Sequence, residues 1–192
     1  MSLIDNFSLE YWKNFERERN QQIYNNRKKI SYNGYEENLA KLLKRYTFKG
    51  VPLWQEVTNL NFYKKTIGIY ILCLPEVRGY YIGQTTVSFY KRIYQHWKRP
   101  KTTFDKTYRQ SDVSNIYIIP LPKVLITDFD AIEQDCIASI SNIFLLNSLM
   151  SPNYLVWIND TNYHPKDFLI PSRKLYYKKE KIFEYQLCNG LS

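Results

Sequence analysis

Cysteine and histidine are both scarce in this chain, which contains three cysteines and two histidines among its 192 residues. The cysteines, Cys73, Cys136 and Cys188, lie far apart, and neither His96 nor His164 stands at metal-ligand spacing from them. We therefore expect no zinc site. An odd and sparse cysteine count also indicates a reducing compartment, so we expect a cytoplasmic protein.

Long apolar runs are also absent from the sequence. No window of about 18 or more apolar residues occurs, so we expect no membrane span. The N-terminus lacks the apolar core of a secretory signal. Hydrophobic residues nevertheless make up 44% of the chain and aromatic residues 17%, which excludes a disordered chain and allows a sizeable core.

Acidic residues are outnumbered, with 18 Asp and Glu against 27 Lys and Arg, which gives a formal net charge of +9. A basic surplus favours a polyanionic partner, and nucleic acid is the commonest. The basic residues between 86 and 109 face a single acid, Asp105; they are Lys91, Arg92, Lys98, Arg99, Lys101, Lys106 and Arg109. This stretch is the best candidate for following a DNA backbone, and residues 173–181 offer a second contact.

Hydrophobic periodicity and turn residues predict a mixed α and β order. The predicted elements, in chain order, are a helix over 6–30, a turn at Asn33-Gly34, a helix over 36–46, strands over 66–74 and 80–84, a helix over 88–98 begun by Ser88, a strand over 114–121, a helix over 128–149 and a hairpin over 174–185. The two strands at 66–84 are expected to pair as an antiparallel hairpin.

This hairpin carries two similar tripeptides, Gly68-Ile69-Tyr70 and Tyr81-Ile82-Gly83. Tyrosine packs well in sheets, so both phenols could serve packing alone. A phenol has a pKa near 10 and seldom acts as a base, although a neighbouring cation favours the phenolate and lowers that pKa.

Three further residues have side chains suited to chemistry on a phosphate. Arg92 and His96 stand one helical turn apart, about 6 Å in rise, so both can address one anion. They could equally lie on a solvated helix surface. Glu133 falls on the apolar stripe of its helix, where a carboxylate needs a partner, or it faces solvent in the first turn and favours the helix dipole.

Taken in order, these residues resemble the GIY-YIG nuclease family. Both tripeptides match its name-giving elements, and the segment after them places Arg92 and His96 on the family's functional Arg and His. Glu133 is similar to its metal-binding Glu, in a helix after a third strand. The resemblance covers about residues 66–150.

The resemblance implies an α+β fold with a small three-stranded antiparallel sheet flanked by helices, which agrees with the predicted element order. We expect an N-terminal helical extension over 1–64, the nuclease core over 65–150, and a C-terminal extension over 151–192 that contacts DNA. The family often has an Asn near the last helix. Asn147 and Asn153 lie near that place, but on an unbroken helix Asn147 would stand about 21 Å from Glu133 and could not share its metal.

The implied reaction is hydrolysis of a phosphodiester with one divalent metal, Mg²⁺ or Mn²⁺, held by Glu133 and phosphate oxygens. Arg92 would neutralise the scissile phosphate. Tyr70 is our first choice as the base, His96 would relay its proton, and Tyr81 would position the water or phosphate, although the two tyrosines could exchange roles.

Several functions remain open at this point. The leading hypothesis is a type II restriction enzyme that cuts double-stranded DNA, with a homodimer as the means of cutting both strands. A homing, mobile-element or repair nuclease of the same family is an alternative, although such proteins usually append a separate DNA-binding domain. A non-catalytic nucleic-acid-binding module, or a structural protein that binds another protein, is a further alternative.

Overall fold

A computed structural model describes Glu18, Asn25, Lys29 and residues 32–100, 103–141, 144–147 and 169–191. The helix predicted over 6–30 therefore lies, apart from three residues, outside the described residues, as does Asn153. The domain boundaries expected at 64/65 and 150/151 stay predictions.

The described chain has an α+β fold. Its elements are α2 (Tyr32–Arg45), β1 (Thr47–Phe48), β2 (Val51–Pro52), β3 (Gln55–Glu56), η1 (Leu60–Tyr63), β4 (Gly68–Leu74), η2 (Pro75–Val77), β5 (Gly79–Thr85), α3 (Phe89–Lys98), α4 (Thr103–Thr107), η3 (Gln110–Asp112), β6 (Asn115–Pro120), η4 (Lys123–Asp128), α5 (Phe129–Ala138) and α7 (Ser172–Cys188).

The main sheet has four antiparallel strands in the order β3-β6-β4-β5, where three had been predicted. The three longer strands are the predicted ones, and the addition is β3, whose two residues pair with Ile118 and Tyr117 of β6. So short a strand has no periodicity that a sequence pattern could reveal. β1 and β2 form a separate two-stranded sheet.

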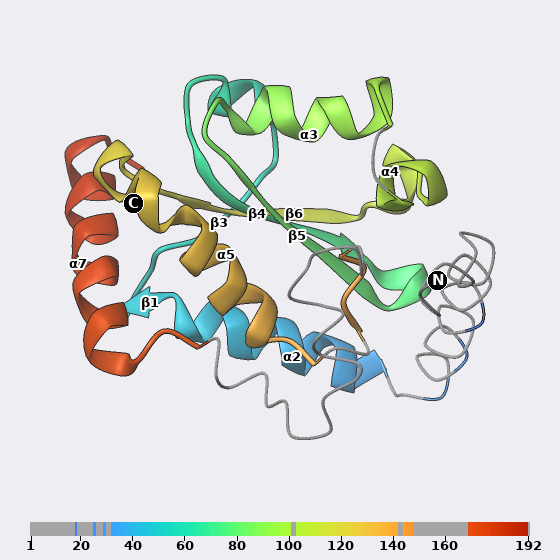
Figure 1. Ribbon diagram of the computed structural model, residues 1–192, viewed down its shortest axis with the longest axis horizontal. Helices are drawn as coiled ribbons and strands as arrows, with labels where there is room; N and C mark the ends of the chain where they lie inside the picture. The colour runs from blue at the N-terminus through green and yellow to red at the C-terminus, as the bar shows by residue number, and fades with distance from the viewer. Residues whose placement is uncertain are drawn as a thin grey trace, which may run out of the picture.

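Helices cover both faces of the main sheet (Figure 1). α3 lies on one face, and α2 and α5 lie on the other. All seven residues of β4 are buried, because β4 is a central strand with a hydrophobic cluster on each side. Side chains alternate along a strand, so Tyr70 and Leu72 face α3 while Ile69 and Ile71 face α5.

α5 is shorter than the helix predicted over 128–149. It ends at Ala138, and the Ser139 hydroxyl donates to the carbonyl of Asp135 at 2.7 Å. Serine competes for backbone hydrogen bonds in this way and weakens helix continuation. Farther along, the backbone N–H of Leu146 donates to the carbonyl of Tyr80 at 2.8 Å, so the chain runs beside β5 instead.

The hairpin predicted over 174–185 is wrong, because these residues belong to the single helix α7. Adjacent tyrosines at 176 and 177 favoured strands, yet both rings are exposed. The buried residues Leu175, Ile182 and Gln186 follow helical spacing. The turn predicted at Asn33-Gly34 is also wrong, since both residues lie in the first turn of α2.

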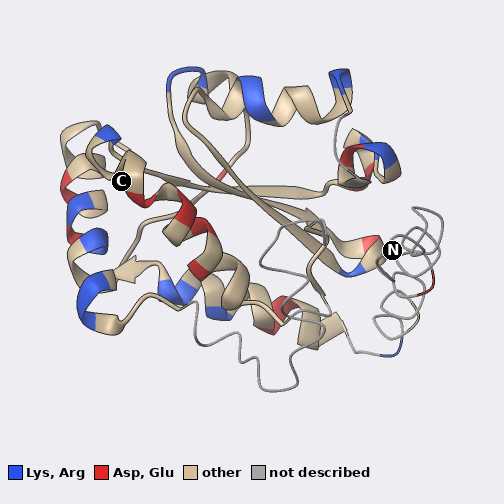
Figure 2. Ribbon diagram, in the orientation of Figure 1, with Lys and Arg blue, Asp and Glu red and all other residues tan. Residues whose placement is uncertain are grey.

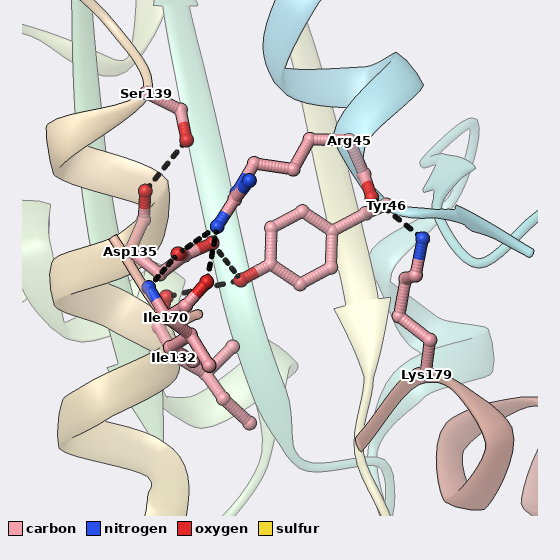
Figure 3. Close-up of polar contacts among 7 residues, drawn as sticks. All are labelled: Arg45, Tyr46, Ile132, Asp135, Ser139, Ile170 and Lys179. Carbon is pink, nitrogen blue, oxygen red and sulfur yellow. Dashed lines mark hydrogen bonds and ion pairs between the residues drawn. The ribbon is translucent and has the colours of Figure 1, made fainter. Parts of the chain in front are cut away.

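A buried ion pair joins α2 to α5 (Figure 3). The Asp135 side chain is fully buried and accepts hydrogen bonds from Arg45 Nε at 2.8 Å and from the Tyr46 hydroxyl at 2.8 Å. The backbone N–H of Ile170, just before α7, donates to the same carboxylate at 2.6 Å. The Lys179 ammonium of α7 donates to the Arg45 carbonyl at 3.3 Å, so one network connects three helices.

Within the described ranges, no helix combines the length and the apolar character needed to cross a membrane.

Candidate active site

The two predicted tyrosines lie on the same face of the sheet. Tyr70 of β4 pairs with Gly83 of β5, and Leu72 pairs with Tyr81. Because side chains alternate, the phenols of Tyr70 and Tyr81 both point toward α3, with ring centroids 6.3 Å apart. Tyr70 is fully buried and Tyr81 is 7% exposed.

Gly83 leaves the space that the Tyr70 phenol occupies. A Cβ atom at Gly83 would stand 2.3 Å from the Tyr70 hydroxyl oxygen and 2.4 Å from its ring carbon Cζ, so any larger residue would displace the ring. Since β5 is the outermost strand on this side, Tyr70 reaches across Gly83 toward the sheet edge. Gly68 is equally constrained, because its φ is +143° and a Cβ would lie 2.1 Å from the Ile119 carbonyl oxygen.

His96 connects Tyr70 to an acid that the sequence pattern did not assign. Ser88 caps α3 by accepting from the backbone N–H of Lys91 at 3.1 Å, and α3 then carries His96 into the core, where it is 1% exposed. The Tyr70 hydroxyl lies 2.7 Å from His96 Nε2. On the other side of the ring, His96 Nδ1 lies within hydrogen-bond distance of the Asp105 carboxylate of α4.

This chain of contacts defines the tautomer of His96. The Asp105 carboxylate can only accept, so we assign the proton to Nδ1, which leaves Nε2 to accept from the Tyr70 hydroxyl. Burial lowers the pKa of His96, against the opposing effect of the Asp105 hydrogen bond. Burial likewise raises the pKa of Tyr70 well above its usual value, so its phenol is neutral here.

α4 holds Asp105 in place through an aromatic contact. Phe104 is 1% exposed and its ring stacks on Tyr81 with centroids 4.2 Å apart. The next residue therefore faces His96. In the sequence, the only sign of Asp105 was that it is the single acid in a basic stretch.

Arg92 lies on α3 beside both phenols and is half-buried. Burial alone would lower the pKa of its guanidinium, but the interactions with Tyr70 and Tyr81 raise that pKa overall. In return, the charge of Arg92 and a hydrogen bond with it oppose the rise in the pKa of Tyr70. Burial raises the pKa of Tyr81 to about 12, again against the effect of Arg92.

Glu133 approaches the same edge from the opposite face, on α5. Its carboxylate accepts from Gln84 Nε2 of β5 at 3.2 Å, and Gln84 also donates to Asp130, one turn earlier on α5. The pKa of Glu133 is raised to about 7, chiefly by burial. The hydrogen bond from Gln84 and the charge of Arg92 oppose this rise, whereas the nearby Asp130 adds to it. The Arg92 guanidinium therefore lies close enough to interact with this carboxylate.

The structure thus brings the five predicted residues to one edge of the sheet, at β5. Tyr70, Tyr81, Arg92 and His96 approach from the α3 face, and Glu133 approaches from the α5 face. Sequence reasoning missed two polar residues that contact them, Asp105 and Gln84, and also Asp130, which accepts from Gln84.

Asn147 occupies a separate position. Its side chain accepts from the backbone N–H of Ile82 at 3.0 Å and donates to the Ile82 carbonyl at 2.6 Å. These two bonds satisfy backbone groups on the outer edge of β5, which would otherwise be unpaired in the sheet. The role of Asn147 is therefore structural support for the strand that carries Tyr81 and Gly83.

The donor set at Glu133 fits a divalent metal that keeps most of its ligands as water and phosphate. No group of three or more His, Cys, Asp or Glu side chains with metal-binding geometry occurs among the residues that the structure covers. In that same part of the chain, no Lys or Arg forms an ion pair with Glu133. A half-buried carboxylate that no salt bridge occupies is a suitable Mg²⁺ ligand, and a bound cation would favour its charged form.

Comparison with known proteins gave no match to a family, to a curated protein or to a solved structure.

Proposed function

We propose that this protein is a divalent-metal-dependent endonuclease that hydrolyses phosphodiester bonds in double-stranded DNA, in the manner of a GIY-YIG nuclease, and that it acts as a type II restriction enzyme. The observation that carries the proposal is the chain of contacts from Asp105 through His96 to Tyr70, beside Arg92 and facing Glu133. Such an arrangement supplies a base, an anion-binding cation and a metal ligand at one edge of the sheet.

The base in this mechanism is Tyr70, with His96 behind it. Its pKa is raised by burial, so the phenol does not exist as a free phenolate. Instead, Tyr70 accepts a proton from the attacking water while its own proton passes to His96 Nε2, across a contact of 2.7 Å. Asp105 stabilises the imidazolium that results, because it already faces Nδ1.

The remaining residues act on the phosphate. The water oxygen attacks phosphorus, the bond to the leaving oxygen breaks, and Arg92 neutralises the charge that develops on the phosphoryl oxygens. Tyr81, next to Tyr70, orients the water or the phosphate. A Mg²⁺ or Mn²⁺ ion held by Glu133 would supply stabilisation of the leaving oxygen.

The charge distribution supports a DNA substrate. Figure 2 shows Lys and Arg along α3, next to the site, and along α7. The α7 cluster is the weaker candidate, because three of its lysines have partners within the protein. Lys178 pairs with Asp128, Lys181 pairs with Glu184, and Lys179 donates to the carbonyls of Arg45 and Thr47.

The test is cleavage of plasmid DNA with Mg²⁺ or Mn²⁺, followed by sequencing of the ends. The wild type should cut, and Tyr70→Phe and Glu133→Ala should lose cleavage while they keep affinity for DNA in a chelator. Recurrent ends would support a restriction enzyme. Binding without cleavage by the wild type would instead identify a nucleic-acid-binding module. A wild type that neither binds nor cleaves DNA would overturn the proposal.

A further inference from the structure

A hollow of about 90 Å³ lies beside the candidate active site on the surface of α3. It is lined by Arg92 and Gln95 of α3, by Arg99 directly after α3, and by Asp105 of α4. Arg92 and Gln95 stand at positions i and i+3, which places them side by side on the helix, and Arg99 follows directly as the C-cap of α3. Tyr70 and Tyr81 do not line this hollow, so it lies next to the proposed reaction centre and not at it.

The lining suits an anion. It presents two guanidinium groups and one carboxamide, which supply hydrogen-bond donors, against one carboxylate. That carboxylate, on Asp105, already accepts a hydrogen bond from His96 Nδ1. Arg99 is exposed and, within the described ranges, its guanidinium forms no ion pair.

We propose that this hollow binds a backbone phosphate adjacent to the scissile one, with Arg99 and Gln95 as its donors. Arg92 belongs to both the proposed reaction centre and the hollow, since it interacts with Tyr70 and also lines the hollow. A strand whose scissile phosphate meets Arg92 therefore continues over Arg99. This inference rests on the proposed nuclease function and adds the direction in which the strand leaves the site.

Arg99 could also have a structural role, and the experiment must distinguish that role from phosphate binding. It follows the last residue of α3, where a cation interacts favourably with the helix dipole. A residue with that role alone would affect the melting temperature and leave DNA binding unchanged. Thermal melts of every variant therefore accompany the binding measurements.

The first experiment measures DNA affinity in a chelator over a range of salt concentrations for Arg99→Gln, Arg99→Lys and Lys98→Gln. Lys98→Gln is the matched control, because it removes the same charge from a side chain that lies over the Tyr94 ring, 4.7 Å from its centroid. Arg99→Gln should weaken binding roughly tenfold and lower the salt slope by about one. Arg99→Lys should recover part of the loss, and Lys98→Gln should change less than Arg99→Gln.

Steady-state cleavage separates binding from chemistry. Arg99→Gln should raise KM with little change in kcat, which is the signature of a contact made equally in the ground and transition states. A loss of kcat with unchanged KM would place Arg99 in the chemical step and overturn the subsite. Equal behaviour of Arg99→Gln and Lys98→Gln would overturn it as well.

The second experiment identifies the phosphate. Oligonucleotides that contain the sequenced cut site carry one neutral methylphosphonate at each position in turn, and their affinity is measured for the wild type and Arg99→Gln. The subsite predicts one position, next to the scissile phosphate, at which neutralisation weakens the wild type but not Arg99→Gln. The subsite is refuted if the wild type and Arg99→Gln differ in their response to neutralisation only at the scissile phosphate, or at no position. A wild type that neither binds nor cuts DNA would instead refute the nuclease function.

Discussion

Glu133→Gln is expected to stabilise the metal-free protein at pH 8. The wild-type carboxylate is half-buried, and burial raises its pKa from 4.5 to about 7. A carboxyl group whose pKa is raised by folding binds more protons in the folded state than in the unfolded state between these two values. The free energy of unfolding therefore falls as pH rises through this window, and above about pH 7 the full penalty is present.

The size of the effect follows from the shift. A change in pKa from 4.5 to about 7 corresponds to at most about 3 kcal/mol, and partial exposure to solvent reduces this to about 1–2 kcal/mol. Glutamine keeps the shape of the side chain without its charge, so the variant should melt about 2–8 °C higher at pH 8. Most of this gain should disappear at pH 5, where the folded wild type has taken up a proton.

The assay is thermal unfolding in a chelator at pH 5 and pH 8, with Glu37→Gln as the control. Glu37 is an exposed carboxylate on α2, so its replacement should change stability by less than about 0.5 kcal/mol. Added Mg²⁺ should then raise the melting temperature of the wild type and not of Glu133→Gln. If Glu133→Gln is neutral or destabilising at pH 8, or gains equally at both pH values, the carboxylate is not desolvated and the reason to place a metal there is lost.

Three further substitutions test other contacts. Gly83→Ala should displace the Tyr70 ring, cost about 1–3 kcal/mol of stability and abolish cleavage, as measured by melting and plasmid assays. Asp105→Asn should lower kcat roughly 10²- to 10⁴-fold without loss of DNA affinity; because the Asp105 hydrogen bond raises the pKa of His96, the acidic limb of the pH–rate profile should also move to lower pH. Asp135→Asn should lower the free energy of unfolding by about 3–5 kcal/mol, since it leaves a charged partner of a buried ion pair without its counterion.

Each of these has an outcome that contradicts it. A Gly83→Ala protein that cleaves normally would show that Tyr70 need not lie across the strand. An unchanged pH profile in Asp105→Asn would remove Asp105 from the proton path. For Asp135, the control is Asp128→Asn, which breaks the pair with Lys178 at a more exposed carboxylate and should cost under about 1 kcal/mol; equal losses would mean that burial of the carboxylate does not matter.

The sequence predicted the elements that have strong local signals. The hairpin at 66–84 is confirmed as β4 and β5, and the helix begun by Ser88 is confirmed as α3 with that cap. Both depend on local patterns: alternation and turn residues for the hairpin, and a capping hydroxyl before an apolar stripe for the helix. The fourth strand was missed because β3 has only two residues, and it forms only when β6 offers an edge.

The errors and omissions share one cause, which is that distant contacts decided the outcome. α5 ends early because the chain after it pairs with β5, and α7 is helical because Leu175 and Ile182 reach the core. Asp105 escaped notice in the same way. It meets His96 through packing of the neighbouring Phe104 on Tyr81, which no sequence periodicity encodes.

The stability of the fold and the geometry of the site are linked through α5. Asp135 and Glu133 are two residues apart, about 200° around the helix. Asp135 therefore fixes α5 to α2 on one side while Glu133 faces Gln84 at the β5 edge on the other. If this anchoring sets the position of Glu133, Asp135→Asn should raise the Mg²⁺ concentration needed for cleavage even at temperatures where the variant is fully folded. An unchanged Mg²⁺ requirement would mean that packing of α5 on the sheet is sufficient to position the carboxylate.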